Sequence, residues 1–204
     1  MIQTFTCALA SLEYGVASVT APDQDESGDR HLVKTVPGGA LLAVVDGSGH
    51  SCAGADPARL AVEVLKSHAC EDLASLMCRC HERLKSTRGA VMGMAKISAT
   101  GNTITWMGVG NIQGWILTTD GTAERMRPRP GIVGYRMPAP QPQVSILAPR
   151  DLIILTTDGI RPDFEQEVIP DDHPRAIADY ISSRFRTGDD DGLVLVARYL
   201  GTSE

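Results

Sequence analysis

The sequence predicts an α+β fold built mainly on antiparallel sheet. Three observations support this class: short apolar runs recur along the chain, turn-forming residues separate most of them, and the segments with helical periodicity are grouped. Helices that alternated with strands would instead favour a parallel sheet. No internal repeat, low-complexity tract or interdomain linker interrupts the 204 residues, so a single domain over 1–204 is expected.

The first clear strand is expected at 39–45. This continuous apolar run stops at the sequence Asp-Gly-Ser-Gly over 46–49, and a run bounded by a glycine-rich turn is typical of a buried strand. Apolar residues at helical spacing then extend from Pro57 to Met77. They predict one or two helices, with Asp56 as the N-cap of the first.

The second half of the chain is expected to be mostly strand. Apolar segments separated by turn signals predict five further strands, at 89–97, 103–109, 113–118, 151–157 and 193–200. A loop rich in Pro and Gly covers 128–142. A helix with one apolar face is expected at 174–186.

The composition is that of an ordinary globular protein, with 43% hydrophobic and 22% charged residues. A formal net charge of −6 gives no support for nucleic-acid binding. No apolar run approaches 18 residues and no signal sequence opens the chain, so neither a membrane span nor secretion is predicted. Five cysteines, an odd number, argue against a disulfide framework, and a cytoplasmic monomer is expected.

Three predicted strands begin or end at an aspartate, namely Asp46, Asp158 and the run from Asp189 to Asp191. A fourth acid, Asp29, comes just before the short apolar pair Leu32-Val33. Carboxylates at neighbouring strand ends can converge, and such hard oxygen ligands suit Mg²⁺ or Mn²⁺ with several retained waters. Glycine directly follows Asp46 and Asp158 and allows close approach of the backbone. A single Asp-Gly pair is more often a simple turn, but the whole set predicts a metal site.

Three other kinds of site are disfavoured. The glycines around Ser48 resemble half of a dinucleotide-binding fingerprint, but Cys52 stands where the third glycine belongs. The longer nucleophile pattern G-x-S-x-G is also missing around Ser48. Cys78 and Cys80 lie on different faces of a predicted helix, and no second ligand pair with zinc spacing occurs, so packing roles are expected for both.

Six motifs occur in the order seen in PP2C-type phosphatases. They are Gly28-Asp29, Val45-Asp-Gly-Ser-Gly-His50, Arg88-Gly-Ala90, Val109-Gly-Asn111, Thr156-Thr-Asp-Gly159 and Asp190-Asp191. The chain resembles the compact bacterial, SpoIIE-like branch of this family, and within it the stressosome phosphatases. The resemblance covers nearly the whole chain. It implies an α/β/β/α sandwich of two mainly antiparallel β-sheets flanked by helices.

The resemblance also implies a ligand set for two divalent cations, Mn²⁺ or Mg²⁺. The implied ligands are Asp29, Asp46, the carbonyl of Gly47, Asp158 and Asp190. Asp46 should bridge the two ions, and Asp29 should bind directly or through water. The three consecutive aspartates leave the register of the last ligand open by one residue.

The implied activity is that of a protein serine/threonine phosphatase, in which a metal-bridging water attacks phosphorus in line. Asp46, Asp158 and His50 are the implied catalytic residues. Two roles stay open for His50: protonation of the leaving oxygen, or orientation of its loop through a hydrogen bond. The implied partners are phosphorylated STAS-domain proteins of the bacterial stressosome.

Two departures from the family pattern keep an alternative open. The final motif commonly reads Asp-Asp/Asn-x-Thr, whereas Leu193 stands at the threonine position here. There is also no clear counterpart of the N-terminal arginine that holds phosphate in larger relatives. The alternative is a catalytically weak or inactive PP2C-like module that binds the same partners.

Overall fold

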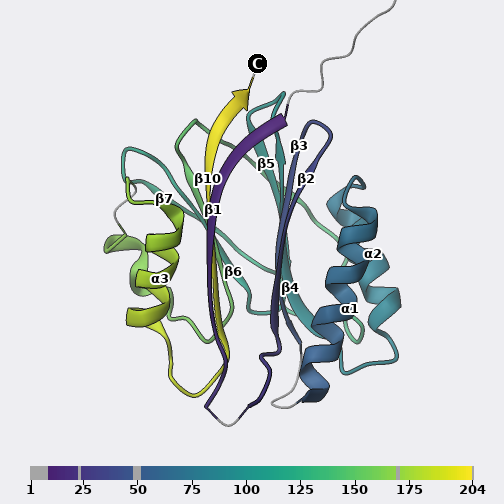
Figure 1. Ribbon diagram of the computed structural model, residues 1–204. Coiled ribbons are helices and arrows are strands. Elements are labelled where there is room, and N and C mark those ends of the chain that lie inside the picture. The colour runs from purple at the N-terminus through teal and green to yellow at the C-terminus, as the bar shows by residue number, and fades with distance from the viewer. Residues whose placement is uncertain (1–8, 23, 48–51, 169–170, 204) are drawn as a thin grey trace, which may run out of the picture.

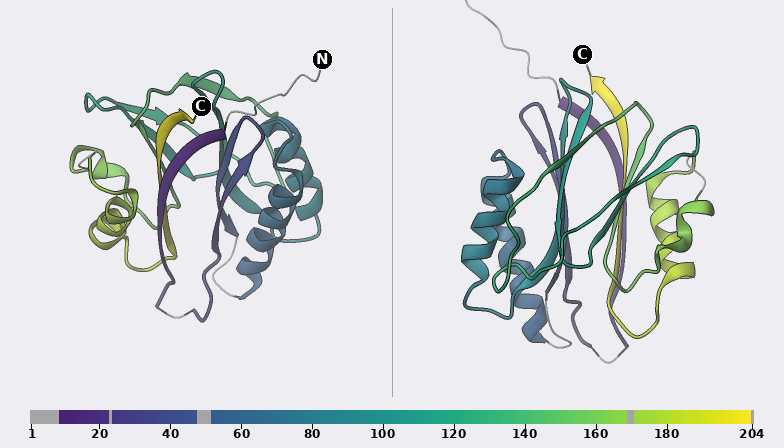
Figure 2. Two further views of the ribbon diagram at one scale, coloured as in Figure 1. Left: turned by 45° about the horizontal axis from the view of Figure 1, so that its top comes forward. Right: turned by 180° about the vertical axis from the view of Figure 1, so that it is seen from behind.

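The computed structural model describes residues 9–22, 24–47, 52–168 and 171–203. In these ranges the chain forms two five-stranded antiparallel sheets that pack face to face, with helices on both outer faces (Figure 1). The predicted α+β sandwich is confirmed. Figure 2 shows the same layers from two further directions, with the two groups of helices on opposite sides of the sandwich.

The first sheet has the strand order β1-β10-β9-β6-β7. Its strands are β1 (Leu9–Val19), β10 (Gly192–Ser203), β9 (Leu152–Thr156), β6 (Gln113–Leu117) and β7 (Ala123–Met126). The outer face is covered by helix α3 (Pro174–Phe185) and the short 3-10 helix η1 (Pro162–Gln166). This sheet therefore joins strands from both ends of the described chain.

The second sheet has the order β2-β3-β4-β5-β8. Its strands are β2 (Asp29–Val36), β3 (Gly39–Gly47), β4 (Ala90–Ser98), β5 (Thr103–Val109) and β8 (Gln143–Ile146). Helices α1 (Cys52–His68) and α2 (Leu73–Leu84) cover its outer face. No helix in the described part of the chain is long and apolar enough to cross a membrane.

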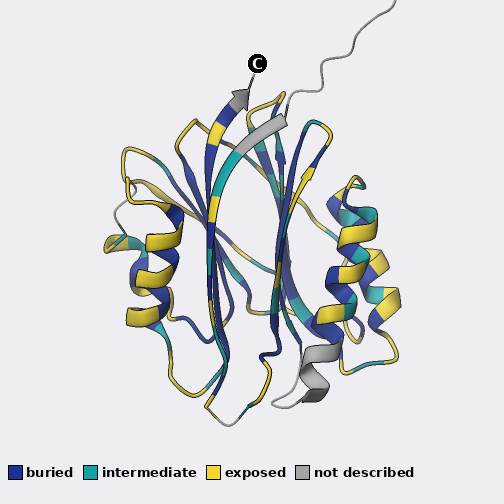
Figure 3. Cartoon of the chain, in the orientation of Figure 1, coloured by how far each residue is buried: buried dark blue, intermediate teal, exposed yellow. Residues whose placement is uncertain are grey.

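The continuous apolar run of β3 follows from burial on both of its faces. Leu42 and Val44 pack into the core between the sheets, whereas Leu41 and Ala43 pack under α1 and α2. β9 is buried in the same way, because the first sheet is also covered on both faces. The burial pattern in Figure 3 shows these inner strands as the most buried part of the fold.

Most of the predicted elements are confirmed, with one boundary wrong. The helix expected to begin at Pro57 begins at Cys52, so Asp56 lies within α1 rather than at its N-cap. Pro57 therefore lies in the second turn of α1, where it removes one intrahelical hydrogen bond. On α2, Cys80 is buried and Cys78 is exposed, which confirms that the two thiols lie on different faces.

One end of the sandwich, the lower end in Figure 1, gathers the chain segments that carry the predicted site. β2 starts there and β3 ends there, since Asp29 pairs directly with Asp46. β9 ends there and β10 starts there, since Thr156 pairs with Val194. The antiparallel order of the sheets therefore brings acids from four separate parts of the sequence to the same end.

Candidate metal centre

Asp29 and Asp46 form the half of the site that belongs to the second sheet. They are direct partners in the register of β2 and β3, and directly opposite residues of an antiparallel pair have Cβ atoms about 5 Å apart. The main chain continues this pairing, since the N–H of Gly47 donates to the carbonyl of Gly28 at 3.2 Å. Asp29 is only 3% exposed, so its carboxylate faces the interior of this end of the molecule.

Asp158 and Asp190 form the half that belongs to the first sheet. Asp158 lies two residues after β9, and Asp190 lies two residues before β10. The two loops touch at Gly159, where a Cβ atom would lie 1.8 Å from the carbonyl oxygen of Asp191. Only glycine fits there, so the close backbone approach expected after Asp158 is present.

The electrostatics show that these acids converge. Burial, and then the neighbouring carboxylate of Asp46, raise the pKa of Asp29 from its usual 3.8 to about 8. Burial, and then the charges of Asp158, Asp190 and Asp191, raise the pKa of Asp46 to about 7. Burial and the charge of Asp190 also raise the pKa of Asp158. Carboxylates gathered in this way repel one another unless a cation lies among them.

The donor set fits a hard divalent cation that keeps part of its water shell. In the ranges that the structure describes, no three side chains of His, Cys, Asp or Glu gather closely enough to hold one ion among them. Mg²⁺ typically takes only one or two carboxylates and retains several waters, which matches acids spread over two strand pairs. The oxygen-only donors disfavour zinc.

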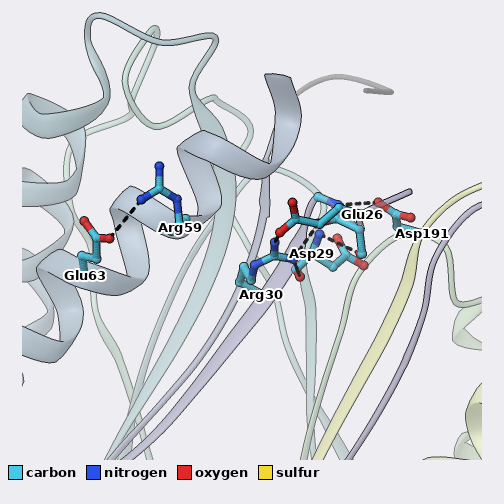
Figure 4. A network of polar contacts seen from close by, with 8 residues as sticks. Glu26, Asp29, Arg30, Arg59, Glu63 and Asp191 are labelled. Carbon is cyan, nitrogen blue, oxygen red and sulfur yellow. Dashed lines mark hydrogen bonds and ion pairs between the residues drawn. The ribbon is translucent and has the colours of Figure 1, made fainter. Parts of the chain in front are cut away.

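Among the three consecutive aspartates, Asp191 is engaged with the backbone. Its two carboxylate oxygens accept hydrogen bonds from the N–H of Ala21 at 2.7 Å and from the N–H of Gly28 at 2.6 Å. Figure 4 shows Asp191 beside the loop that leads to Asp29. Asp191 thereby fixes the loop that leads into β2. Asp189 is exposed and Asp190 is half-buried, and the charges of both Asp190 and Asp191 act on Asp46. Metal binding by Asp190 stays a prediction.

Two polar residues hold the acids in place and had no role assigned from the sequence. The hydroxyl of Thr157 donates to Asp29 at 2.8 Å and accepts from the N–H of Leu193 at 2.9 Å. The amide of Asn111 donates to Asp158 at 2.6 Å. Both lie in motifs quoted for the family resemblance. A buried threonine next to Asp-Gly at a strand end was the available signal.

The remaining predicted site residues are only partly described. Gly47 is the buried last residue of β3, and metal binding by its carbonyl stays a prediction. His50 lies outside the described residues, and its two implied roles stay predictions.

Two antiparallel sheets covered by helices on both outer faces are the fold of PP2C-type serine/threonine phosphatases. The family model of Stage II sporulation protein E (SpoIIE) matches residues 37–199, and the chain belongs to this family.

Individual relatives agree with this assignment. The chain is 28% identical over 136 residues to the phosphoserine phosphatase RsbX of Bacillus subtilis (strain 168), covering 65% of this chain and 67% of RsbX. A crystal structure of RsbX in complex with magnesium is similar with a TM-score of 0.83 at 19% identity, covering 92% of this chain and 95% of that one. A chain from structural work on the bacterial stressosome has a TM-score of 0.84 at 29% identity, covering 92% and 100%.

Proposed function

We propose that this protein is a metal-dependent phosphatase that removes phosphate from phosphoserine or phosphothreonine in stressosome proteins carrying STAS domains. The observation that carries the proposal is the convergence of acids from both sheets, with pKa values raised to about 8 for Asp29 and about 7 for Asp46. The similarity to RsbX and to a stressosome-related structure supports the partner class.

The ligand set proposed for two Mn²⁺ or Mg²⁺ ions uses both halves of the site. Asp46 is the shared ligand, because it pairs with Asp29 in its own sheet and experiences the charges of Asp158 and Asp190 from the other. Gly47 contributes its carbonyl. When bound, the two ions supply a nucleophilic water near neutral pH and neutralise charge on the phosphoryl oxygens.

The protein's own contribution is to hold these ligands in position before substrate binds. Thr157 orients the Asp29 carboxylate, Asn111 orients that of Asp158, and Asp191 fixes the loop before β2. Such supporting hydrogen bonds set both ligand geometry and metal affinity. His50 remains the candidate for protonating the leaving serine or threonine oxygen.

The test is Mn²⁺-dependent release of phosphate from a phosphorylated STAS-domain protein. Wild-type protein should release phosphate, and a chelator or Asp46→Asn should abolish the release. Asp163→Asn is the matched control, because Asp163 is an exposed acid with 62% of its side-chain surface accessible and should tolerate the same substitution. Phosphate release that survives both chelator and Asp46→Asn would refute the two-metal mechanism.

The alternative, a binding module without activity, gives a different result. It would bind the phosphorylated STAS-domain protein with the same affinity in the presence and absence of Mn²⁺, and would release no phosphate. The altered final motif is the main sequence feature in its favour. At that motif, the N–H of Leu193 donates to the hydroxyl of Thr157, which also holds Asp29.

A further inference from the structure

A groove of about 420 Å³ opens beside the candidate metal centre, at the edge of the sandwich where β1 and β2 are the outermost strands. Helix α1 forms one wall, β1 and β10 form the other, and β2 contributes the floor. The charged residues that line it include Asp29, Arg30, Arg59, Glu63 and Lys66. Since Asp29 is also part of the acidic set, one end of the groove is the candidate metal centre itself.

The groove is more positive than the rest of the molecule. Among the described residues, three cations line it against two acids, whereas the whole chain carries a formal charge of −6. Asp29 belongs to the proposed metal ligands, which leaves Glu63 as the acid that faces a bound segment. A groove of this charge attracts an acidic segment and repels a basic one.

Two of the cations are held in place by the fold (Figure 4). The guanidinium of Arg30 donates to the carbonyls of Ser27 at 2.6 Å and Asp29 at 2.9 Å, and it also pairs with Glu26. Arg59 pairs with Glu63 at 3.4 Å across one turn of α1, and both side chains are more than half exposed. Because that pair is long and exposed, Arg59 can exchange Glu63 for an acid on a bound segment at little energetic cost.

The length of the groove limits which residues of a substrate it can reach. Arg59 and Lys66 are seven positions apart on α1, which corresponds to about 10 Å along the helix. An extended chain covers that distance in about three residues. With a phosphoserine at the metal centre, the substrate residues on one side of it, up to about four positions away, would therefore lie between Arg59 and Lys66.

We infer that this groove recognises acidic residues on one side of the phosphoserine, within about four positions of it. The inference rests on the proposed function and adds a substrate preference to it. The occupant is an acidic segment of the phosphoprotein substrate, held by ion pairs with Arg59 and Lys66 on α1 and with Arg30 on β2.

The experiment compares three peptides that differ only in the flanks of one phosphoserine, which are acidic, neutral or basic. Binding is measured by fluorescence anisotropy with the non-hydrolysed phosphonate analogue of phosphoserine in the presence of Mn²⁺. Turnover is measured as kcat/KM with the phosphoserine peptides. Two exposed ion pairs should favour the acidic over the neutral peptide by about tenfold in both measurements. The preference should fall as the salt concentration rises.

The double variant Arg59→Glu with Lys66→Glu should reduce the ratio of acidic to neutral peptide to one or below, and should favour the basic peptide. The matched control is Arg79→Glu with Arg83→Glu on α2. It makes the same charge change and also removes an ion pair, that of Arg79 with Glu71 in the loop before α2. The control should retain the wild-type ratio, because neither residue lines the groove.

The two proposals can fail separately. If wild-type protein with Mn²⁺ fails to hydrolyse p-nitrophenyl phosphate as well as every peptide, the proposed function is wrong. If wild-type protein hydrolyses p-nitrophenyl phosphate but binds the acidic and neutral peptides equally, the groove inference is wrong. Equal changes of the ratio in the two double variants would also overturn it, since they would reflect net charge rather than the groove.

Discussion

Asp29 and Asp151 are both buried aspartates, 3% and 2% exposed, at opposite ends of the sandwich. Burial raises the pKa of each carboxyl group. Asp151 precedes β9 and accepts a hydrogen bond from the N–H of Ala148 at 2.8 Å, closing a turn within its own loop. Asp29 faces acids from both sheets.

The difference shows that burial alone does not mark a functional acid in this protein. Among the described residues, Asp120 is the one other carboxylate that raises the pKa of Asp151, and its contribution is the smallest. For Asp29, the carboxylates of Asp46, Asp191 and Asp158 all raise the pKa. Asp151 is thus a buried acid bound by a backbone N–H group of its own loop, whereas Asp29 belongs to a group of acids whose mutual repulsion a cation would relieve. The following experiments test this contrast.

The largest difference is expected between Asp46→Asn and Asp151→Asn, the same substitution at opposite ends of the sandwich. Asp46→Asn should lower Mn²⁺-dependent phosphatase activity on the order of 1,000-fold, because it removes the shared ligand. Asp151→Asn should leave kcat/KM within about twofold of wild type, since the amide oxygen can still accept from Ala148 and the residue lies at the far end. Steady-state kinetics on a phosphoserine peptide measure both. Comparable losses of kcat/KM in the two variants would contradict the proposed difference between the acids at the two ends of the sandwich.

Next in size is the contrast between the neighbours Asp190 and Asp191. Asp190→Asn should weaken Mn²⁺ binding by about 10- to 100-fold, measured by isothermal titration calorimetry, with little change in stability. Asp191→Asn should mainly destabilise the fold, by about 1–3 kcal/mol in urea unfolding, because its amide group would face the N–H of Ala21 or Gly28. The reverse pattern would assign the ligand to Asp191.

A smaller effect is expected from two adjacent buried threonines. Thr157→Val removes the donor to Asp29 and should lower Mn²⁺ affinity about tenfold, and Thr157→Ser should restore it. Thr156→Val is the control, because its hydroxyl oxygen is buried without a hydrogen-bond partner among the described residues. That variant should have wild-type affinity and equal or greater stability. Equal effects at the two positions would mean that the Thr157 hydroxyl does not position Asp29.

The smallest effect concerns pH. The folded-state pKa values of about 8 for Asp29 and about 7 for Asp46 exceed the usual 3.8, so the folded protein binds more protons than the unfolded chain between these values. Stability of the metal-free protein should therefore fall as pH rises from about 4 to 8.

Urea unfolding at pH 5, 6.5 and 8 with a chelator measures this dependence. Mn²⁺ should restore stability at pH 8, because it binds the folded state and neutralises the repulsion. Asp46→Asn should flatten the pH dependence, since it removes one of the repelling charges, whereas Asp151→Asn should change it less. Metal-free stability that rises with pH would contradict the repulsion between the acids.

The strands that the sequence predicts best are those whose burial shows directly in their own run of apolar residues. β3 and β9 are continuous apolar runs because both faces of each strand are covered. β1 was missed because it is an edge strand with exposed residues such as Tyr14, and its pairing partner lies at the other end of the sequence. β7 and β8 were missed because each has four largely exposed residues.

The same distinction applies to the candidate site. Asp46 and Asp158 were identifiable because each follows a buried strand and precedes glycine. The roles of the three final aspartates could not be told apart in the same way. They depend on the N–H groups of Ala21 and Gly28, which donate to Asp191 from 170 and 163 residues away along the chain. No local sequence pattern indicates which of the carboxylates accepts from those N–H groups. The role of Asp191 as a loop anchor therefore becomes visible only in the folded structure.

The hydrogen bond from Thr157 to Asp29 joins residues 128 positions apart, one from each sheet. During synthesis, β2 and β3 exist long before Asp158 and Asp190 have been added to the chain. A partly made chain therefore carries only half of the proposed ligands, and its affinity for cations should be correspondingly low. Tight binding of Mn²⁺ would then begin only when the last strand takes its place in the first sheet. In a refolding experiment, the time at which tight Mn²⁺ binding appears would thus report when the last strand joins the first sheet.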